Sequence, residues 1–272
     1  MLRFDLFPEG KRKALTLSYD DGRVFDRRLV EIMNKYGIRG TFHLNTAYEK
    51  DDRYVRRSEY KSLYAGHEIS CHGHVHPDYT NIPLSGIAGD LIENKRILEE
   101  EAGCPVRGMS YPYGRFNEKT VEILRGCGME YSRTVSNTPE KGRFELPADF
   151  MRWNPTCKHH DCLKILPEFM DTHYKDRLTV FYVWGHSYEF DHDNNWELIE
   201  TFCREASGQK DVWYAANIEI MDYQNAIRSL RVSANGGMYY NPSLTDIWAT
   251  SPDGPVCIRS GEVWREPYPM HF

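Results

Sequence analysis

Apolar positions along the chain follow two alternating patterns, one typical of strands and one typical of helices. In residues 14–19 an apolar side chain stands at every second position, which predicts a short buried strand. In residues 24–36, by contrast, Phe25, Leu29 and Ile32 recur at helical spacing, which predicts an amphipathic helix. The chain therefore opens with a strand followed by a helix.

The same two patterns recur downstream. Further strands are expected at residues 40–45, 106–110, 130–134, 178–184 and 212–216, and residues 67–77 are expected to form a strand that passes into a loop. Further helices are expected at residues 58–64, 84–102, 117–125, 162–174, 196–207 and 217–230. This alternation predicts an α/β fold, in which βα units surround a parallel sheet or barrel. In such barrels the chemistry gathers at the carboxyl ends of the strands.

The pattern changes near residue 231. Turn signals at residues 235–237, 252–254 and 260–261 separate short β-like runs. We therefore expect one barrel domain over residues 1–230 and a small β-rich appendage, residues 231–272, packed on it.

Composition narrows the range of partners. The 272-residue chain has a net charge of −6 with both signs mixed, and it has no basic stripe, so nucleic acid is not an expected partner. No apolar run is long enough for a membrane anchor, and the first residues, MLRFDLFP, do not form a signal peptide. Seven scattered cysteines favour free thiols in a reducing compartment, so we expect a cytoplasmic protein, although a secreted protein trimmed of its signal would look the same.

Two adjacent carboxylates, Asp20 and Asp21, follow the first predicted strand and precede Gly22. Such neighbours repel each other, and burial disfavours their charge, so a bound cation would stabilise the pair. The alternative is an ordinary Asp-Gly turn in which Asp20 caps the following helix. Taken alone, the motif favours the turn.

A dense group of histidines changes that balance. Of the eleven histidines in the chain, four fall within ten positions, at His67, His72, His74 and His76. His72 and His76 lie four apart, but Gly73 and Pro77 disfavour a helix, so a loop must bring the two imidazoles together. One carboxylate with two imidazoles suits a catalytic divalent metal.

With these residues the chain resembles the polysaccharide deacetylase family, the NodB-homology group of metal-dependent carbohydrate esterases (carbohydrate esterase family 4). The matching motifs keep the family's order across residues 13–220: LSYDDG at 17–22, GHEISCHGHVHPD at 66–78, YPYG at 111–114 and VWGH at 183–186. The first two motifs together are specific, and the last two are weak alone.

The resemblance implies a distorted, incomplete (β/α)7 barrel and a set of roles. The resemblance implies that Asp20 is the general base and that His186 is the general acid. It implies that Asp21, His72 and His76 bind the metal, and that the backbone N–H of Tyr113 binds the oxyanion. Zinc is the first expectation for the metal, and cobalt, manganese, nickel or iron would also fit such ligands. Trp153 and Trp184 are candidates to stack on a sugar, with burial in the core as the alternative.

The chain departs from the family's pattern in three places. Ser110 stands where the third motif often carries an arginine that orients the base, so Arg133 or Arg152 would have to replace it. The family's Asp-Trp motif has only residues 149–153 as its nearest counterpart. The absence of a signal peptide favours a small or oligomeric intracellular substrate over a cell-wall polymer.

The expected function is therefore removal of an N-acetyl, or an O-acetyl, group from a carbohydrate. The expected enzyme class is a hydrolase of carbon–nitrogen bonds other than peptide bonds, acting on linear amides. One alternative is a hydrolase of a small non-sugar amide on the same scaffold. Another is a carbohydrate-binding relative without catalysis. Neither a membrane nor nucleic acid is an expected partner, and the sequence leaves the oligomeric state open.

Overall fold

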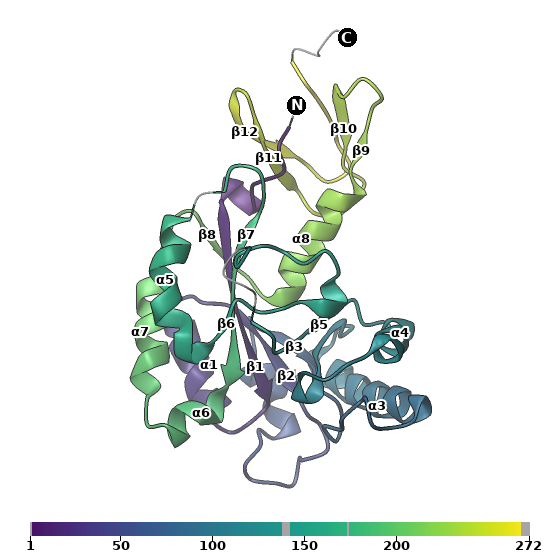
Figure 1. Ribbon diagram of the computed structural model, residues 1–272, viewed down its shortest axis with the longest axis vertical. Coiled ribbons are helices and arrows are strands. Elements are labelled where there is room, and N and C mark those ends of the chain that lie inside the picture. The colour runs from purple at the N-terminus through teal and green to yellow at the C-terminus, as the bar shows by residue number, and fades with distance from the viewer. Residues whose placement is uncertain (1, 138–141, 173, 268–272) are drawn as a thin grey trace.

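A curled parallel sheet forms the centre of the molecule in a computed structural model, which describes residues 2–137, 142–172 and 174–267 (Figure 1). The strands follow the order β5-β4-β3-β2-β1-β7-β6, and β8 also pairs with β1. Their bounds are β1 Lys13–Asp21, β2 Gly40–Leu44, β3 Glu68–Cys71, β4 Gly108–Ser110, β5 Tyr131–Arg133, β6 Cys157–Lys158, β7 Thr179–His186 and β8 Val212–Tyr214. The expected α/β fold, a distorted (β/α)7 barrel, is confirmed.

Strand β1 organises this sheet. It pairs with β7 along nearly its whole length on one edge, and on the other edge β8 covers its start and β2 covers its end. All but its last residue are buried, which explains the nearly continuous apolar and small side chains of its sequence. The register sets Asp20 opposite His186 on one side and His43 on the other, so distant parts of the sequence meet at this strand end.

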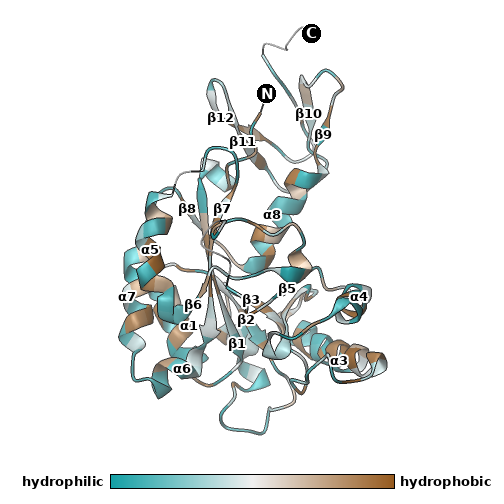
Figure 2. Ribbon diagram, viewed as in Figure 1, coloured by the Kyte–Doolittle hydropathy of each residue, from teal (hydrophilic) through white to brown (hydrophobic). Residues whose placement is uncertain are grey.

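Helices cover the sheet in two groups (Figure 1). One group comprises α1 Asp26–Lys35, α5 Cys162–Asp171, α6 Ser187–His192 and α7 Trp196–Ala206, and the other comprises α3 Leu84–Ala102 and α4 Glu118–Gly126. Short α2 Tyr60–Leu63 and long α8 Asn217–Ser229 complete the set. Brown apolar and teal polar stretches alternate along these helices, and the apolar side chains of α1, such as Leu29 and Met33, are buried (Figure 2).

Most helices of the structure overlap the residue ranges predicted from the sequence, and α3 begins and ends at the predicted residues. The predicted helix over residues 162–174 ends at Asp171, and residue 173 lies outside the described residues. Helix α6 was not predicted, because six residues are too few to show a helical period. Among the described residues no helix is both long and apolar enough to cross a bilayer.

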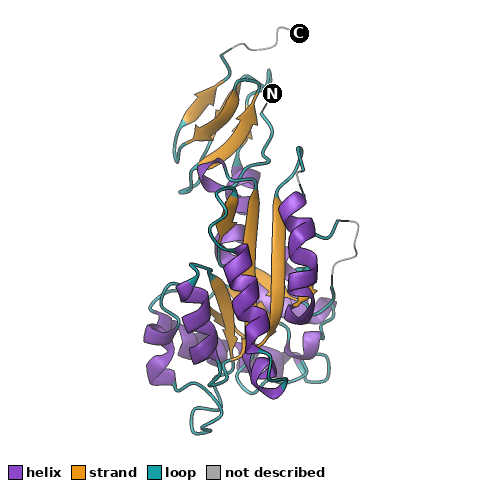
Figure 3. Ribbon diagram, turned by 90° about the vertical axis from the view of Figure 1, so that its left-hand side faces the viewer, coloured by secondary structure: helices purple, strands orange, loops and turns teal. Residues whose placement is uncertain are grey.

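The last strands form two small antiparallel sheets beyond the start of β1, away from the carboxyl ends of the large sheet (Figures 1 and 3). One sheet contains β9 Arg231–Val232, β10 Met238–Tyr240 and β13 Val263–Arg265, and the other contains β11 Ile247–Ser251 and β12 Gly254–Ile258. The N-terminal segment joins them, since Arg3 bridges Thr250 and Leu2 shares their apolar cluster. The boundary at residue 231 remains a prediction, and residues 268–272 lie outside the described part.

Candidate active site

The carboxyl ends of the parallel strands surround one cleft of about 430 Å³. This placement follows from the fold, because parallel strands that enter a sheet from the same side also leave it on the same side. The lining residues come from the ends of β1, β3, β4, β5, β6 and β7 and the segments after them: Asp20, Asp21, His72, His76, Tyr111, Tyr113, Gly114, Val135, Lys158, Trp184, His186 and Tyr188.

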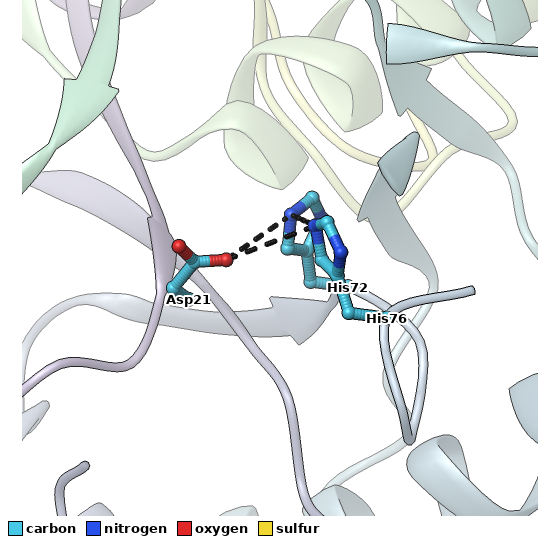
Figure 4. Close-up of side chains that lie close together, drawn as sticks. All are labelled: Asp21, His72 and His76. Atoms are coloured by element: carbon cyan, nitrogen blue, oxygen red, sulfur yellow. Dashed lines mark hydrogen bonds and ion pairs between the residues drawn. The ribbon is translucent and has the colours of Figure 1, made fainter. Parts of the chain in front are cut away.

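Asp21, His72 and His76 point toward one another within this cleft (Figure 4). Oδ1 of Asp21 lies 3.5 Å from Nε2 of His72 and 3.9 Å from Nε2 of His76, and the two Nε2 atoms are 3.1 Å apart. The Nδ1 atom of His72 lies 2.9 Å from the carbonyl oxygen of Ser110, which can only accept a hydrogen bond. Nδ1 therefore carries the proton of the neutral ring, and Nε2 presents its lone pair to the cluster. One carboxylate and two imidazoles arranged in this way fit a divalent transition metal.

The loop that carries the two histidines is fixed on both sides by polar side chains, the half-buried Asp90 and the buried Asn45. The carboxylate of Asp90, on α3, accepts hydrogen bonds from the backbone N–H groups of His74 and Val75, each at 2.9 Å. The side-chain amide of Asn45 donates to the carbonyl groups of His72 and Gly73, at 2.7 and 2.9 Å. These contacts supply the convergence that a helix would otherwise give to residues four apart.

Left-handed backbone conformations mark the same region. Asp21 has φ = 80°, His76 has φ = 54° and Tyr113 has φ = 58°, although none of them is glycine. Each such residue costs about 1–3 kcal/mol and persists only where the surrounding structure holds it. All three line the cleft, so backbone strain is concentrated at the site.

Asp20 is held from two sides and is 2% exposed. The Ser110 hydroxyl donates to its Oδ1 at 2.9 Å, and the guanidinium of Arg133 donates to its Oδ2. Arg133 also lies over the ring of Trp184, with 4.4 Å to the centroid. Burial acts to raise the pKa of Asp20, but the charge of Arg133 holds that pKa far below its ordinary value. The carboxylate therefore stays ionised.

The structure thus selects Arg133 over Arg152 as the partner of Asp20. Arg152 instead pairs with Asp149 and with Glu118, outside the cleft. The side chain of Asp149 also accepts a hydrogen bond from the N–H of Met151, so residues 149–153 do not form a counterpart of the family's Asp-Trp motif at the site.

The expected stacking role of Trp153 is not supported by its position. Its side chain is 1% exposed and packs edge-on against Tyr131, Phe150 and Tyr182, with ring centroids 4.7–5.9 Å apart. A core side chain without access to the cleft cannot stack on a ligand, so burial, the stated alternative, describes Trp153. Trp184 is also largely buried, at 8% exposure, but it does line the cleft.

His186 lies beside a carboxylate that the sequence analysis missed. Oε2 of Glu189 is 3.4 Å from Nδ1 of His186, and Oε1 accepts a hydrogen bond from Nζ of Lys158 at 2.6 Å. Burial acts to lower the pKa of His186, but Glu189 and then Asp20 raise it, so the pKa lies above its ordinary value. Glu189 lies three residues after His186 in the first turn of α6, and its carboxylate also accepts a hydrogen bond from the backbone N–H of His186. A glutamate at this spacing is typical of a helix start, and this was the sequence signal that could have identified Glu189.

Aromatic side chains form the rim of the cleft. Tyr113 is 60% exposed, and its ring lies edge-on to His76 with 4.5 Å between centroids. Tyr188 also lines the cleft, and Arg23 lies 5.2 Å from the centroid of its ring and 4.7 Å from that of Tyr54. Such rings and a guanidinium offer flat surfaces to a ligand.

A buried carboxyl, Asp26, connects the two halves of the site. It begins α1, directly after the segment that carries Asp20 and Asp21, and it is 1% exposed. Its oxygens accept hydrogen bonds from Ser187, which follows His186, at 2.5 Å and from Tyr64 at 2.7 Å. Burial raises the pKa of Asp26 to about 7, against the lowering effect of these two hydrogen bonds.

Comparisons with known proteins agree with the motifs. The family model described as polysaccharide deacetylase matches residues 8–132. The uncharacterized protein YlxY of Bacillus subtilis is 22% identical over 116 residues, which cover 43% of this chain and 35% of YlxY. The matched region thus spans about a third of that relative.

Solved structures share the fold. One assigned to the polysaccharide deacetylases from Mycobacterium smegmatis has a TM-score of 0.60 at 19% identity, over 82% of this chain and 93% of that one. The Xyl-CE4 domain of a multidomain xylanase from the hindgut metagenome of Trinervitermes trinervoides gives 0.53 at 13% identity, over 79% and 92%. A mutant of a Bacillus anthracis CE4 family pseudoenzyme with restored enzymatic activity gives 0.51 at 17% identity, over 77% and 67%. The resemblance to the polysaccharide deacetylase family is therefore confirmed over residues 8–132, and the fold is shared over most of the chain.

Proposed function

We propose that the protein is a metal-dependent hydrolase that removes an acetyl group from the nitrogen, or the oxygen, of a carbohydrate. The observation that carries this proposal is the convergence of an ionised carboxylate, a metal-ligand cluster and a histidine–carboxylate pair in one cleft. Nε2 of His72, in the cluster, lies only 3.9 Å from Oδ2 of Asp20. The match to the polysaccharide deacetylase family supports the same reaction class.

Asp21, His72 and His76 are the residues that would hold the metal. When bound, a divalent cation of this type polarises an acyl carbonyl and lowers the pKa of water. Zinc is the first candidate, and cobalt, manganese, nickel or iron suit the same mixture of carboxylate and imidazole.

The remaining residues supply proton transfer and orientation. Asp20, kept ionised by Arg133 and oriented by Ser110, is placed to accept the proton of the attacking water. His186, with Glu189 at its Nδ1, is placed to deliver a proton to the departing nitrogen, which is a poor leaving group without it. The backbone N–H of Tyr113 is the proposed donor to the developing negative charge on the acyl oxygen.

A carbohydrate suits the rim better than a small amide does. The exposed ring of Tyr113 and the Arg23–Tyr188 pair extend the binding surface beyond the reacting centre, where a neighbouring sugar would contact them. A small non-sugar amide would leave these rings without a partner.

A non-catalytic relative is the second candidate. The observation that favours it is the fold shared with a protein described as a CE4 family pseudoenzyme. Ser110, in the place of the usual arginine, is a further departure, but Arg133 and Ser110 together already hold the proposed base.

Release of acetate tests the proposal directly. Chelator-treated protein reloaded with Zn²⁺ or Co²⁺ should release acetate from N-acetylated or O-acetylated sugar oligomers faster than from small acetamides. Asp20→Asn should abolish release while leaving metal binding in place. Arg152→Gln, at an exposed ion pair outside the cleft, is the matched control and should retain activity. If the reloaded wild type releases no acetate but still binds the oligomers, the non-catalytic candidate replaces the enzyme.

A further inference from the structure

A second cluster of imidazoles and a carboxylate lies behind His186. His159 and His160 form a short turn after β6, and Glu189 lies in the first turn of α6. Each offers a ligand atom, and the three atoms lie within 4.8 Å of one another. The proposed hydrolysis uses neither His159 nor His160.

His159 is fully buried, and its ring nitrogens lack hydrogen-bond partners among the described residues. The ring stacks on Phe190 at 4.2 Å and lies parallel to Tyr19 at 6.0 Å. It packs so closely on Gly185 that a Cβ there would lie 1.9 Å from Nδ1, so glycine is required at that position. Buried imidazole nitrogens without partners are rare because they lose hydration and gain nothing in return. Oε2 of Glu189 lies 3.4 Å from Nε2.

We propose that His159, His160 and Glu189 bind a second divalent transition metal, of the zinc type. Two imidazoles and a carboxylate form a ligand set that such ions prefer. Two ligand atoms at about 2.1 Å from a tetrahedral ion lie about 3.4 Å apart, which is the separation of Nε2 of His159 and Oε2 of Glu189.

This carboxylate oxygen is contacted by the backbone N–H of His186 at 3.3 Å, but it is not paired with a lysine. Lys158 occupies the other oxygen of Glu189, Oε1, at 2.6 Å, so Oε2 faces the two imidazoles without competition from the ammonium group. His160 is 40% exposed, which allows its ring to turn toward the ion and leaves room for water as a fourth ligand. Asp193 lies 3.2 Å from Nε2 of His160, and its negative charge offsets the positive charge of Lys158.

The stoichiometry of Zn²⁺ binding tests the second site. Calorimetric titration of the chelator-treated full chain with Zn²⁺ should give two ions for the wild type. It should give one ion for His72→Ala/His76→Ala, one for His160→Gln, and none when the three changes are combined. His192→Gln is the matched control, because His192 is an exposed neighbour of the same Asp193, and it should still bind two ions.

Three results would overturn the second site. They are a wild type that binds one ion, a His72→Ala/His76→Ala variant that binds none, and a His160→Gln variant that still binds two. In each case the 3.4 Å approach of His159 to Glu189 is a contact within the protein and not a metal site. Because His160 is exposed, its substitution leaves the core intact, and circular dichroism checks that the variant is folded. The count does not depend on turnover, so its failure and the failure of the hydrolase proposal are separate results.

Discussion

The guanidinium of Arg133 contacts the carboxylate of Asp20 beneath the cleft, and their side chains are 0% and 3% exposed. Arg133 comes from β5 at one edge of the sheet, and Asp20 comes from β1 at its centre. Such a buried pair is sensitive to the loss of one partner, because the remaining charge is then left in a low-dielectric environment without compensation.

Removing Arg133 alone should therefore destabilise the protein. Arg133→Met should lower the free energy of unfolding by about 3–5 kcal/mol and abolish acetate release. Adding Asp20→Asn should restore much of the stability but none of the activity, since no buried charge is then unpaired. Denaturant unfolding of the metal-free proteins measures the difference. As a control, Arg152→Met should change stability by less than about 1 kcal/mol, and an equal loss in both single variants would refute the assignment.

The pH dependence of turnover should report the pairing of Glu189 with His186. A general acid must be protonated, so activity falls as pH rises through the pKa of His186, which Glu189 holds above its ordinary value. In Glu189→Gln that raising charge is gone, so the alkaline limb of kcat/KM should move to lower pH. Glu197→Gln, on the exposed face of α7, should leave the profile unchanged. An unshifted alkaline limb in Glu189→Gln would contradict the pairing.

Asp26 should make stability decrease between mildly acidic and neutral pH. Its pKa is about 7 in the folded state and has an ordinary value of 3.8, so unfolding releases a proton between these two values. The stability that this group contributes is present in full below pH 3.8 and is lost as pH rises through 7. Asp26→Asn should accordingly gain stability relative to the wild type as pH rises from 4 to 7. Unfolding by urea in the presence of a chelator checks this, with the exposed Asp253→Asn as a control whose difference from wild type stays constant.

Excess zinc should inhibit the enzyme, if both the hydrolase and the second metal site are correct. The oxygen Oε2 of Glu189 lies 3.4 Å from Nδ1 of His186 and 3.4 Å from Nε2 of His159, so it cannot serve both the acid and an ion. Acetate release should rise with the first equivalent of Zn²⁺ and fall with the second. His160→Gln should abolish the fall but retain the rise. Equal inhibition of the two proteins would show that zinc acts elsewhere.

The alternation of strand and helix periods in the sequence was sufficient to predict the parallel sheet and the edge at which the candidate site residues converge. Because the strands of successive βα units run parallel, their carboxyl ends lie on the same side of the sheet. Residues at the ends of predicted strands, such as Asp21 and His72, are therefore expected to meet there. The ends of α3 could also be predicted, because a long amphipathic run leaves little choice in where the helix begins and ends.

The partners of these residues depended on tertiary register, which no local pattern encodes. Arg133 and Arg152 were equal candidates until the pairing of β5 placed the first beneath Asp20. Glu189 was missed because α6 is too short to show a period. Trp153 was a candidate for stacking on a sugar, with burial as the alternative, because indole suits both. Only its packing against Tyr182 decides between these two roles.

The position of β1 determines how the site would be lost on heating. Its backbone is hydrogen-bonded along both edges, to β7 on one side and to β8 and β2 on the other. Amide protons in such a strand exchange with deuterium only through global opening. The two carboxylates of the cleft are part of this last-opening unit, so activity should persist until the whole sheet melts cooperatively, while the short strands near the C-terminus exchange earlier without effect on turnover.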